Sequence, residues 1–339
     1  PPLHGDILRS YVPAIEAATH SAMASWPSDS PVRMLDAGRD LTLDVIVQVI
    51  FGVHAAEDIE RLGKPFADLL DLALSTETPI RYAARRLGTL RSWGTLRDVN
   101  RRIDDIVLPL IARRRANAEP GRATDVLSML VDARGEDGDQ LSDNEIRADV
   151  ITLMLAGHET TATTLAWLVD LLAHHPDVQR RVRAEIGTGR TDYTEAVINE
   201  TLRLRPPAPI TGRMTAEKYR LGDYTLPAGT RIVLLLDAIN RDPETYPDPD
   251  TFDPERFVGT RPNPYGWVPF GGGIKRCIGA SFSMCELSTI LHTMLAQAEL
   301  RPASRRLESP ATHAAPVIVP RHGAQVYVSP LSRPVEASA

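Results

Sequence analysis

Residues 143–174 are predicted to form one continuous helix, and this stretch constrains the fold more than any other. Ser142 followed by Glu145 is the capping-box pattern that starts a helix, and Pro176 is a signal that ends it. At about 1.5 Å per residue, such a helix spans about 48 Å. We therefore expect a single helix to cross the whole domain.

The middle of this stretch is unusually polar. Its two ends are apolar, but residues 156–164 read AGHETTATT. Glycine and threonine are weak helix formers, and a buried glutamate is costly unless it has a partner. Such a conflict between local preference and overall pattern is typical of functional sites. A Ser/Thr-rich patch that faces another helix explains the segment equally well, so this pattern alone does not decide its role.

The rest of the sequence indicates a mainly α protein with a smaller β region. Apolar residues recur at helical spacing in 5–26, 39–52, 58–74 and 96–118. From Pro206 to Pro269 the pattern changes to short β-branched segments, such as TRIVLLL, separated by many prolines. The length of 339 residues allows one large domain or two smaller ones.

Composition and charge exclude several classes of protein. The net charge of −6 gives no electrostatic reason to bind nucleic acid or an anionic membrane surface. No apolar run approaches the ~20 residues that a membrane span needs. The only cysteines, Cys277 and Cys285, cannot form a disulfide framework, which is typical of a reducing compartment. We expect a cytoplasmic protein.

Glu200 and Arg203 lie three positions apart on a predicted helix that ends at Pro206, so their side chains can pair. Arg256, in the later segment FDPERF, could complete a buried charge network. The same E-x-x-R spacing occurs at 119–122 and 217–220, where we expect surface charges. A buried arginine needs a fixed carboxylate partner, so the pair would have to form in the folded core.

Cys277 follows a glycine-rich turn directly and precedes an amphipathic run. The dinucleotide fingerprint fails because Arg276 stands where it needs glycine, and the other phosphate loop fails because no Gly-Lys-Ser/Thr is present. Structural zinc needs four Cys or His ligands, and Cys285 would lie about 12 Å further along the helix. A single sulfur at a helix N-terminus remains, beside Lys275 and Arg276. Such surroundings favour the thiolate that binds metals, and the glycines let a flat ligand approach the backbone.

Residues 270–279, FGGGIKRCIG, resemble the haem-binding loop of the cytochrome P450 family of haem-thiolate monooxygenases. AGHETT at 156–161 is similar to that family's oxygen-binding segment, and Glu200, Arg203 and Arg256 resemble its buried charge triad. The motifs occur in the family's order across essentially the whole chain. The resemblance implies a cytochrome P450 fold with a long central helix over the haem. It also implies a single domain over 1–339, helix-rich in 1–205 and mixed in 206–339.

The resemblance implies a role for each matching residue. Glu159 and Thr160 would deliver protons to bound dioxygen. Glu200, Arg203 and Arg256 would brace the cysteine loop from behind. The residues that would bind haem b are Cys277 as the axial iron ligand, Phe270, Gly271, Gly273 and Gly279 around it, Arg213 and Lys275 at the propionates, and Ala156 and Gly157 on the central helix.

This resemblance implies an enzyme that inserts one oxygen atom from dioxygen into an apolar small molecule. A separate ferredoxin and ferredoxin reductase would supply electrons, since the sequence contains no flavin or iron–sulfur segment. Two alternatives stay open: a peroxide-driven or rearranging haem-thiolate enzyme, and a haem-binding protein without activity.

The first residues, PPLHGDILRSY, resemble a segment that follows the family's haem-contacting third helix. A substantial N-terminal part would then be absent, including further propionate ligands and one wall of the pocket. We therefore expect the chain as given to bind haem weakly.

Overall fold

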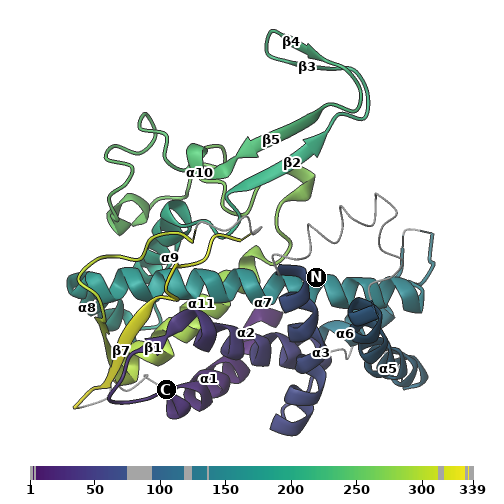
Figure 1. The fold of residues 1–339 in the computed structure, drawn as a ribbon, viewed down its shortest axis with the longest axis horizontal. Coiled ribbons are helices and arrows are strands. Elements are labelled where there is room, and N and C mark those ends of the chain that lie inside the picture. Colours follow the sequence, from purple (N-terminus) through teal and green to yellow (C-terminus); the bar gives the residue numbers. More distant parts are fainter. Residues whose placement is uncertain are drawn as a thin grey trace.

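The computed structural model describes residues 3, 5–74, 94–117, 124–135, 137–311, 317–332 and 335. Its fold is mainly helical, as the sequence predicts (Figure 1). The α-helices are α1 (Ile7–Ser25), α2 (Met34–Phe51), α3 (Ala56–Leu74), α5 (Gly94–Ala116), α6 (Val126–Asp132), α7 (Asp143–His174), α8 (Pro176–Glu185), α9 (Asp192–Leu204), α10 (Leu236–Ile239) and α11 (Ala280–Gln297). Two 3-10 helices are η1 (Pro254–Phe257) and η2 (Gly273–Lys275).

The strands form three small antiparallel sheets within the described residues. They are β1 (Val32–Arg33), β2 (Ile210–Met214), β3 (Tyr219–Leu221), β4 (Tyr224–Leu226), β5 (Arg231–Leu235), β6 (Ala298–Pro302) and β7 (Gln325–Pro330). One sheet has the order β1-β7-β6, and the others pair β2 with β5 and β3 with β4. The pairs β2–β5 and β3–β4 extend away from the helices as an arm (Figure 1). Within the described residues, no helix is long and apolar enough to cross a membrane.

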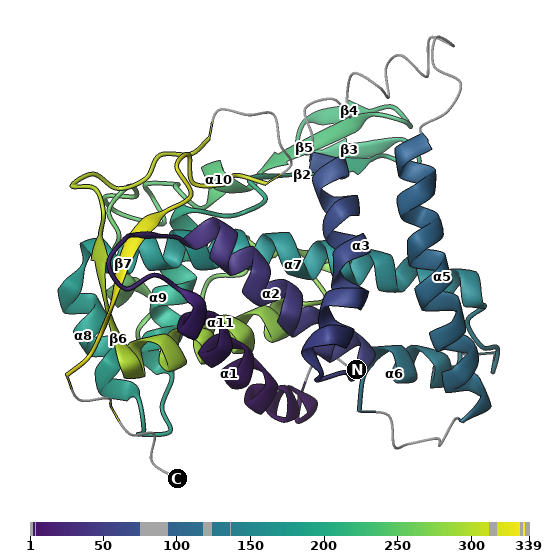
Figure 2. The same ribbon diagram turned by 60° about the horizontal axis from the view of Figure 1, so that its bottom comes forward.

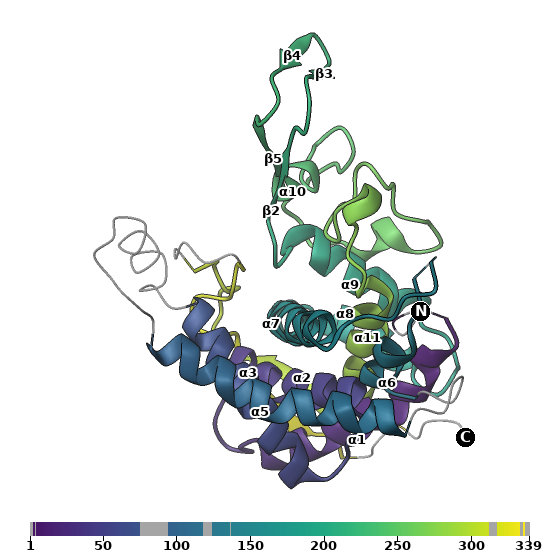
Figure 3. The ribbon, with the colours of Figure 1, turned by 90° about the vertical axis from the view of Figure 1, so that its right-hand side faces the viewer.

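Helix α7 is the axis of the fold and has the bounds that the sequence predicts. The Ser142 hydroxyl accepts a hydrogen bond from the Glu145 backbone N–H at 3.3 Å, and the Glu145 carboxylate accepts from the Ser142 N–H at 2.8 Å. Every residue from 162 to 173 is buried, which is typical of a helix enclosed on all sides. Seen end-on, α7 lies between α2, α3 and α5 on one side and α9 with β2 and β5 on the other (Figure 3).

Helix α2 lies closest to α7, because small residues let the two backbones approach. A Cβ added at Gly38 would stand 3.3 Å from the Ala162 carbonyl oxygen, and one at Gly157 would stand 3.1 Å from the Ile46 side chain. Helix α3 packs against α2, and α5 packs against the other side of α3 (Figure 2). The face of α7 toward α2 is therefore closed by close packing.

We expect Ser142→Ala to lower the free energy of unfolding by about 1 kcal/mol, because it removes the side-chain cap of the longest described helix. Chemical denaturation measures this change. Thr152→Ala is the matched control. Thr152 lies away from the ends of the same helix, its side chain is exposed, and its hydroxyl bonds only the Ala148 carbonyl oxygen. Equal stability of the Ser142→Ala variant and the control would contradict a stabilising role for the cap.

Candidate active site

A cavity of about 280 Å³ separates the middle of α7 from the glycine-rich segment that carries Cys277. Its walls are mostly apolar and come from α7, α2, the segment leading into β2, the cysteine loop and the start of α11. Of the predicted site residues, it is lined by Ala156, Gly157, Thr160, Arg213, Phe270, Gly271, Lys275, Cys277 and Gly279. Gly273 and Glu159 are not among the lining residues.

The cysteine loop is a tight, hydrogen-bonded turn. The Cys277 N–H donates to the Phe270 carbonyl oxygen at 2.9 Å, which closes the loop. Gly271 and Gly273 have φ values of +67° and +66°, a region that residues with a Cβ rarely adopt. Gly273 therefore shapes the turn through its backbone without reaching the cavity. Cys277 is exposed and lies three residues before Ala280, the first residue of α11.

The donor set of the cavity suits an iron porphyrin with two propionates. It offers one sulfur, which can bind iron, within mostly apolar walls. It also offers two cations, Arg213 and Lys275, and neither has a carboxylate partner among the described residues. The Arg213 guanidinium bonds only the Thr211 hydroxyl and the Gly212 carbonyl oxygen. Two unpaired cations beside an apolar cavity fit an anionic ligand.

Thr160 and Glu159, predicted to act together, face different surroundings. Thr160 lines the cavity, and its hydroxyl donates to the Ala156 carbonyl oxygen at 2.6 Å. Glu159 is buried, and Arg39 of α2 donates to both of its carboxylate oxygens at 2.8 and 2.6 Å. The Arg39 side chain is 34% exposed, so this ion pair extends from the protein surface to the buried side of α7. Arg39 was not among the predicted site residues, because nothing near it in the sequence shows that Glu159 is its partner.

The structure brings Glu200, Arg203 and Arg256 together. Glu200 and Arg203 are fully buried and form a two-fold ion pair, with N–O distances of 2.6 and 2.8 Å. Arg256 lies 3.6 Å from Glu200, too far for a hydrogen bond but close enough for charge attraction. Of the other E-x-x-R pairs, Glu217 and Arg220 are exposed, and 119–122 lies outside the described residues.

Aromatic rings lead from this network to the loop. The Arg203 guanidinium lies 5.0 Å from the centre of the Tyr246 ring, which contacts Phe257. Trp267 then packs edge-on against Phe257 and Phe270, with ring centres 6.3 and 5.8 Å apart. Phe270 is thus the last ring of a packed series and the first residue of the closed loop.

The sequence model of the cytochrome P450 family matches residues 1–328. The chain belongs to this family. Cytochrome P450 137 of Mycobacterium tuberculosis is 56% identical over 330 residues, which cover 97% of this chain and 69% of that protein. Cytochrome P450 138 of Mycobacterium bovis is 35% identical over 298 residues, covering 87% of this chain and 67% of that protein.

A solved structure, retinoic acid bound cyanobacterial CYP120A1, shares the fold. Its TM-score is 0.81 at 24% sequence identity, and the match covers 97% of this chain and 76% of that one. As a cytochrome P450, the protein is a haem-thiolate monooxygenase, an oxidoreductase that uses dioxygen and takes electrons from redox partners. The predictions of family, fold and enzyme class are confirmed.

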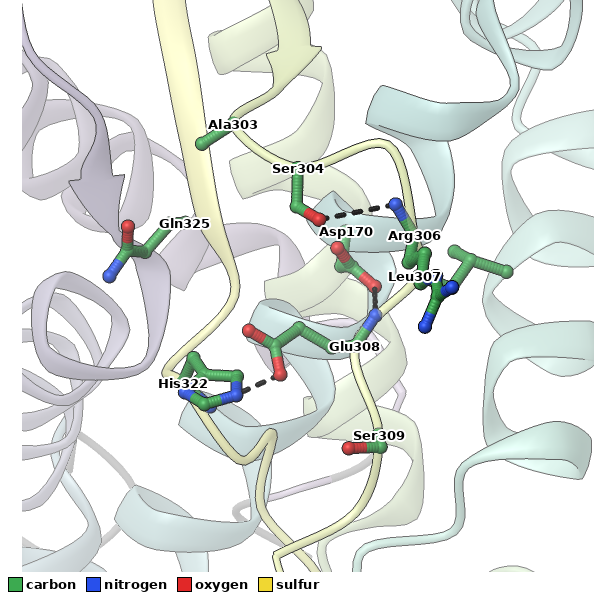
Figure 4. Close-up of a pocket in the computed structure, with 9 residues that line it drawn as sticks. All are labelled: Asp170, Ala303, Ser304, Arg306, Leu307, Glu308, Ser309, His322 and Gln325. Carbon is green, nitrogen blue, oxygen red and sulfur yellow. Dashed lines mark hydrogen bonds between the residues drawn. The ribbon is translucent and has the colours of Figure 1, made fainter.

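A second cavity, of about 510 Å³, lies near the C-terminal end of α7, at Asp170, and is lined by none of the predicted site residues (Figure 4). Its polar groups bond one another. The Asp170 carboxylate accepts from the Glu308 N–H at 3.0 Å, and the Glu308 carboxylate accepts from the His322 N–H at 3.1 Å. These bonds attach the C-terminal segment of the P450 to its central helix, so we assign a structural role to the residues of this cavity.

Replacing Arg203 with methionine should lower the free energy of unfolding by about 3–5 kcal/mol, because the buried charge of Glu200 would keep only the more distant Arg256 as a partner. Arg190→Met is the control, since Arg190 forms an ion pair with Asp192 in which both side chains are mostly exposed. Its removal should cost less than about 1 kcal/mol. Urea denaturation compares the two variants, and a similar small loss in both would show that the buried pair does not hold the fold.

His158 should make the protein less stable as the pH falls. Burial, and secondarily the charge of Arg39, lowers its pKa to about 4, and its Nδ1 lies 3.0 Å from the Thr42 hydroxyl. In the unfolded chain the imidazole titrates near pH 6.5, so between these values the unfolded state binds the extra proton. The free energy of unfolding should fall by about 2 kcal/mol from pH 7 to pH 5 through this residue.

His158→Gln should remove this part of the pH dependence, which denaturation at several pH values measures. His20→Gln, at an exposed position, controls for the general effect of losing a histidine. A pH dependence that His158→Gln leaves unchanged would rule out a neutral buried imidazole.

Proposed function

We propose that this P450 inserts one oxygen atom from dioxygen into an apolar small molecule, with Cys277 as the axial ligand of haem b. The observation that carries the proposal is the cavity that Cys277, Arg213 and Lys275 share with the polar middle of α7. When bound, haem with a thiolate ligand supplies the activation of oxygen. Arg213 and Lys275 would neutralise its propionates.

An apolar substrate is proposed from the walls of the cavity. Leu153 and Ala156 of α7 and the turn at Ala208 and Ile210 line it, together with Ile46 of α2. Such walls bind a ligand by excluding water and offer few polar groups to orient it. We infer that shape, rather than hydrogen bonding, selects the substrate. A separate ferredoxin and its reductase would supply the electrons, and the cytoplasm is the compartment we propose.

Thr160 is the residue proposed to hold or pass a proton at the cavity wall, since its hydroxyl is part of that wall. The Glu159 carboxylate could reload it only after leaving Arg39, which binds both of its oxygens. The same observation favours one alternative function. A peroxide-driven reaction needs no relay of protons to dioxygen, and the Arg39 pair would then be structural.

Cys277→Ala should abolish the red-shifted Soret band that reduced, CO-bound protein shows when a thiolate binds the iron. Cys285→Ala is the matched control and should keep the band. Cys285 is half-buried in α11, its sulfur lies 3.9 Å from the Leu8 carbonyl oxygen, and burial raises the pKa of its thiol. If the band depends on Cys285 instead, the assignment of the loop is wrong.

A further inference from the structure

Asn240 lies between the buried charge network and the cysteine loop and is bonded to both. It follows α10 directly and is fully buried. Its carbonyl oxygen accepts a hydrogen bond from Arg203 Nη1 at 3.0 Å. Its side-chain Oδ1 accepts from the Val268 backbone N–H at 3.0 Å. One residue thus connects the Glu200–Arg203 pair to the segment that enters the loop.

From Val268, two further backbone bonds reach Cys277. The Val268 carbonyl oxygen accepts from the Gly271 N–H at 2.9 Å, which forms the turn at the start of the loop. The Phe270 carbonyl oxygen accepts from the Cys277 N–H, also at 2.9 Å, and closes it. Asn240 therefore fixes Val268, the residue that accepts the first hydrogen bond of the loop.

Only one half of the Asn240 amide has a partner, and a comparison with other residues shows why asparagine still suits this position. Its Nδ2 is buried and has no hydrogen-bond partner among the described residues, which destabilises a fold. A leucine of similar size would avoid that defect, and an aspartate would add a second buried negative charge near Glu200. Asparagine is neutral and still offers an accepting oxygen. Leucine could not accept the hydrogen bond from Val268 at all, and aspartate would accept it only at the cost of a buried charge.

We propose that Asn240 is a positioning residue that transmits the rigidity of the Glu200–Arg203 pair to the loop carrying Cys277. The inference rests on the proposed function, in which Cys277 binds the haem iron. Asn240 does not line the cavity and acts only through Val268. Its loss lets the loop open locally while the helical core stays folded.

Trp267 offers a second attachment of the same segment, and it stays intact in Asn240 variants. Its indole N–H donates to the Asn199 carbonyl oxygen of α9 at 3.0 Å, and its ring packs against Phe270. A change in the loop after substitution of Asn240 alone therefore reports the bond from Asn240 to Val268.

Hydrogen exchange followed by mass spectrometry tests the proposal, with and without bound haem. Asn240→Leu removes the accepting oxygen, so peptides covering 264–278 should exchange about tenfold faster relative to peptides of α7. Asn240→Asp keeps that oxygen and adds a buried charge. The whole protein should become less stable, while the ratio of loop to α7 exchange stays as in the unmodified chain.

Asn263→Ala is the matched control. Asn263 belongs to the same segment and its Oδ1 also accepts a backbone N–H, that of Tyr265 at 3.0 Å, but it is exposed. It should leave the loop's exchange ratio unchanged. If Asn240→Leu does not yield folded protein, Asn240→Ser replaces it, because its shorter hydroxyl cannot reach Val268.

The spectrum of the reduced, CO-bound protein gives the second readout. The share of protein with the thiolate band should fall about tenfold in Asn240→Leu and remain in Asn240→Asp and Asn263→Ala. Loop exchange that rises only in step with α7, or an unchanged ratio in Asn240→Leu, overturns the proposal. Absence of the thiolate band in unmodified protein that has bound haem would instead contradict the proposed function. The exchange ratios of the haem-free protein would still test the role of Asn240.

Discussion

The close contact between α2 and α7 is the constraint on which the rest of the structure depends. Gly38 and Gly157 leave no room for larger side chains, so one face of the central helix is sealed. The polar residues on that face must find partners across the contact, and His158 and Glu159 find them in Thr42 and Arg39. Beside this contact, apolar and threonine side chains of α7 line the cavity, together with Ile46 of α2.

The second organising element is the Glu200–Arg203 pair, which holds a segment that has little helix or strand of its own. Besides Glu200, the Arg203 guanidinium bonds the carbonyl oxygens of Asn240, Pro249 and Thr251, which lie along an irregular segment. A buried pair is weak evidence of net stability, because removing two charges from water is costly. Its effect here is geometric, since one planar group fixes three points of the backbone.

Much of this arrangement could be predicted from the sequence, because the signals are local. The bounds of α7 follow from a cap and a proline a few residues away, and the turn of the cysteine loop follows from its glycines. Contacts over long separations gave no such signal. Arg39 meets a carboxylate 120 positions away, and Asn240 resembles an ordinary turn residue until Val268, 28 positions later, is seen to donate to it. The sheet that pairs Val32 with Val326 was missed for the same reason.

Helix geometry also limits what the AGHETT pattern can decide about mechanism. Successive residues of a helix point about 100° apart, so adjacent side chains can face different surroundings. In α7 the threonine faces the cavity and the glutamate faces α2, where a partly exposed arginine holds it. The sequence motif therefore records two contacts on different sides of one helix. Whether they act together depends on the strength of the Arg39–Glu159 pair, and that strength is set by α2, a helix outside the motif.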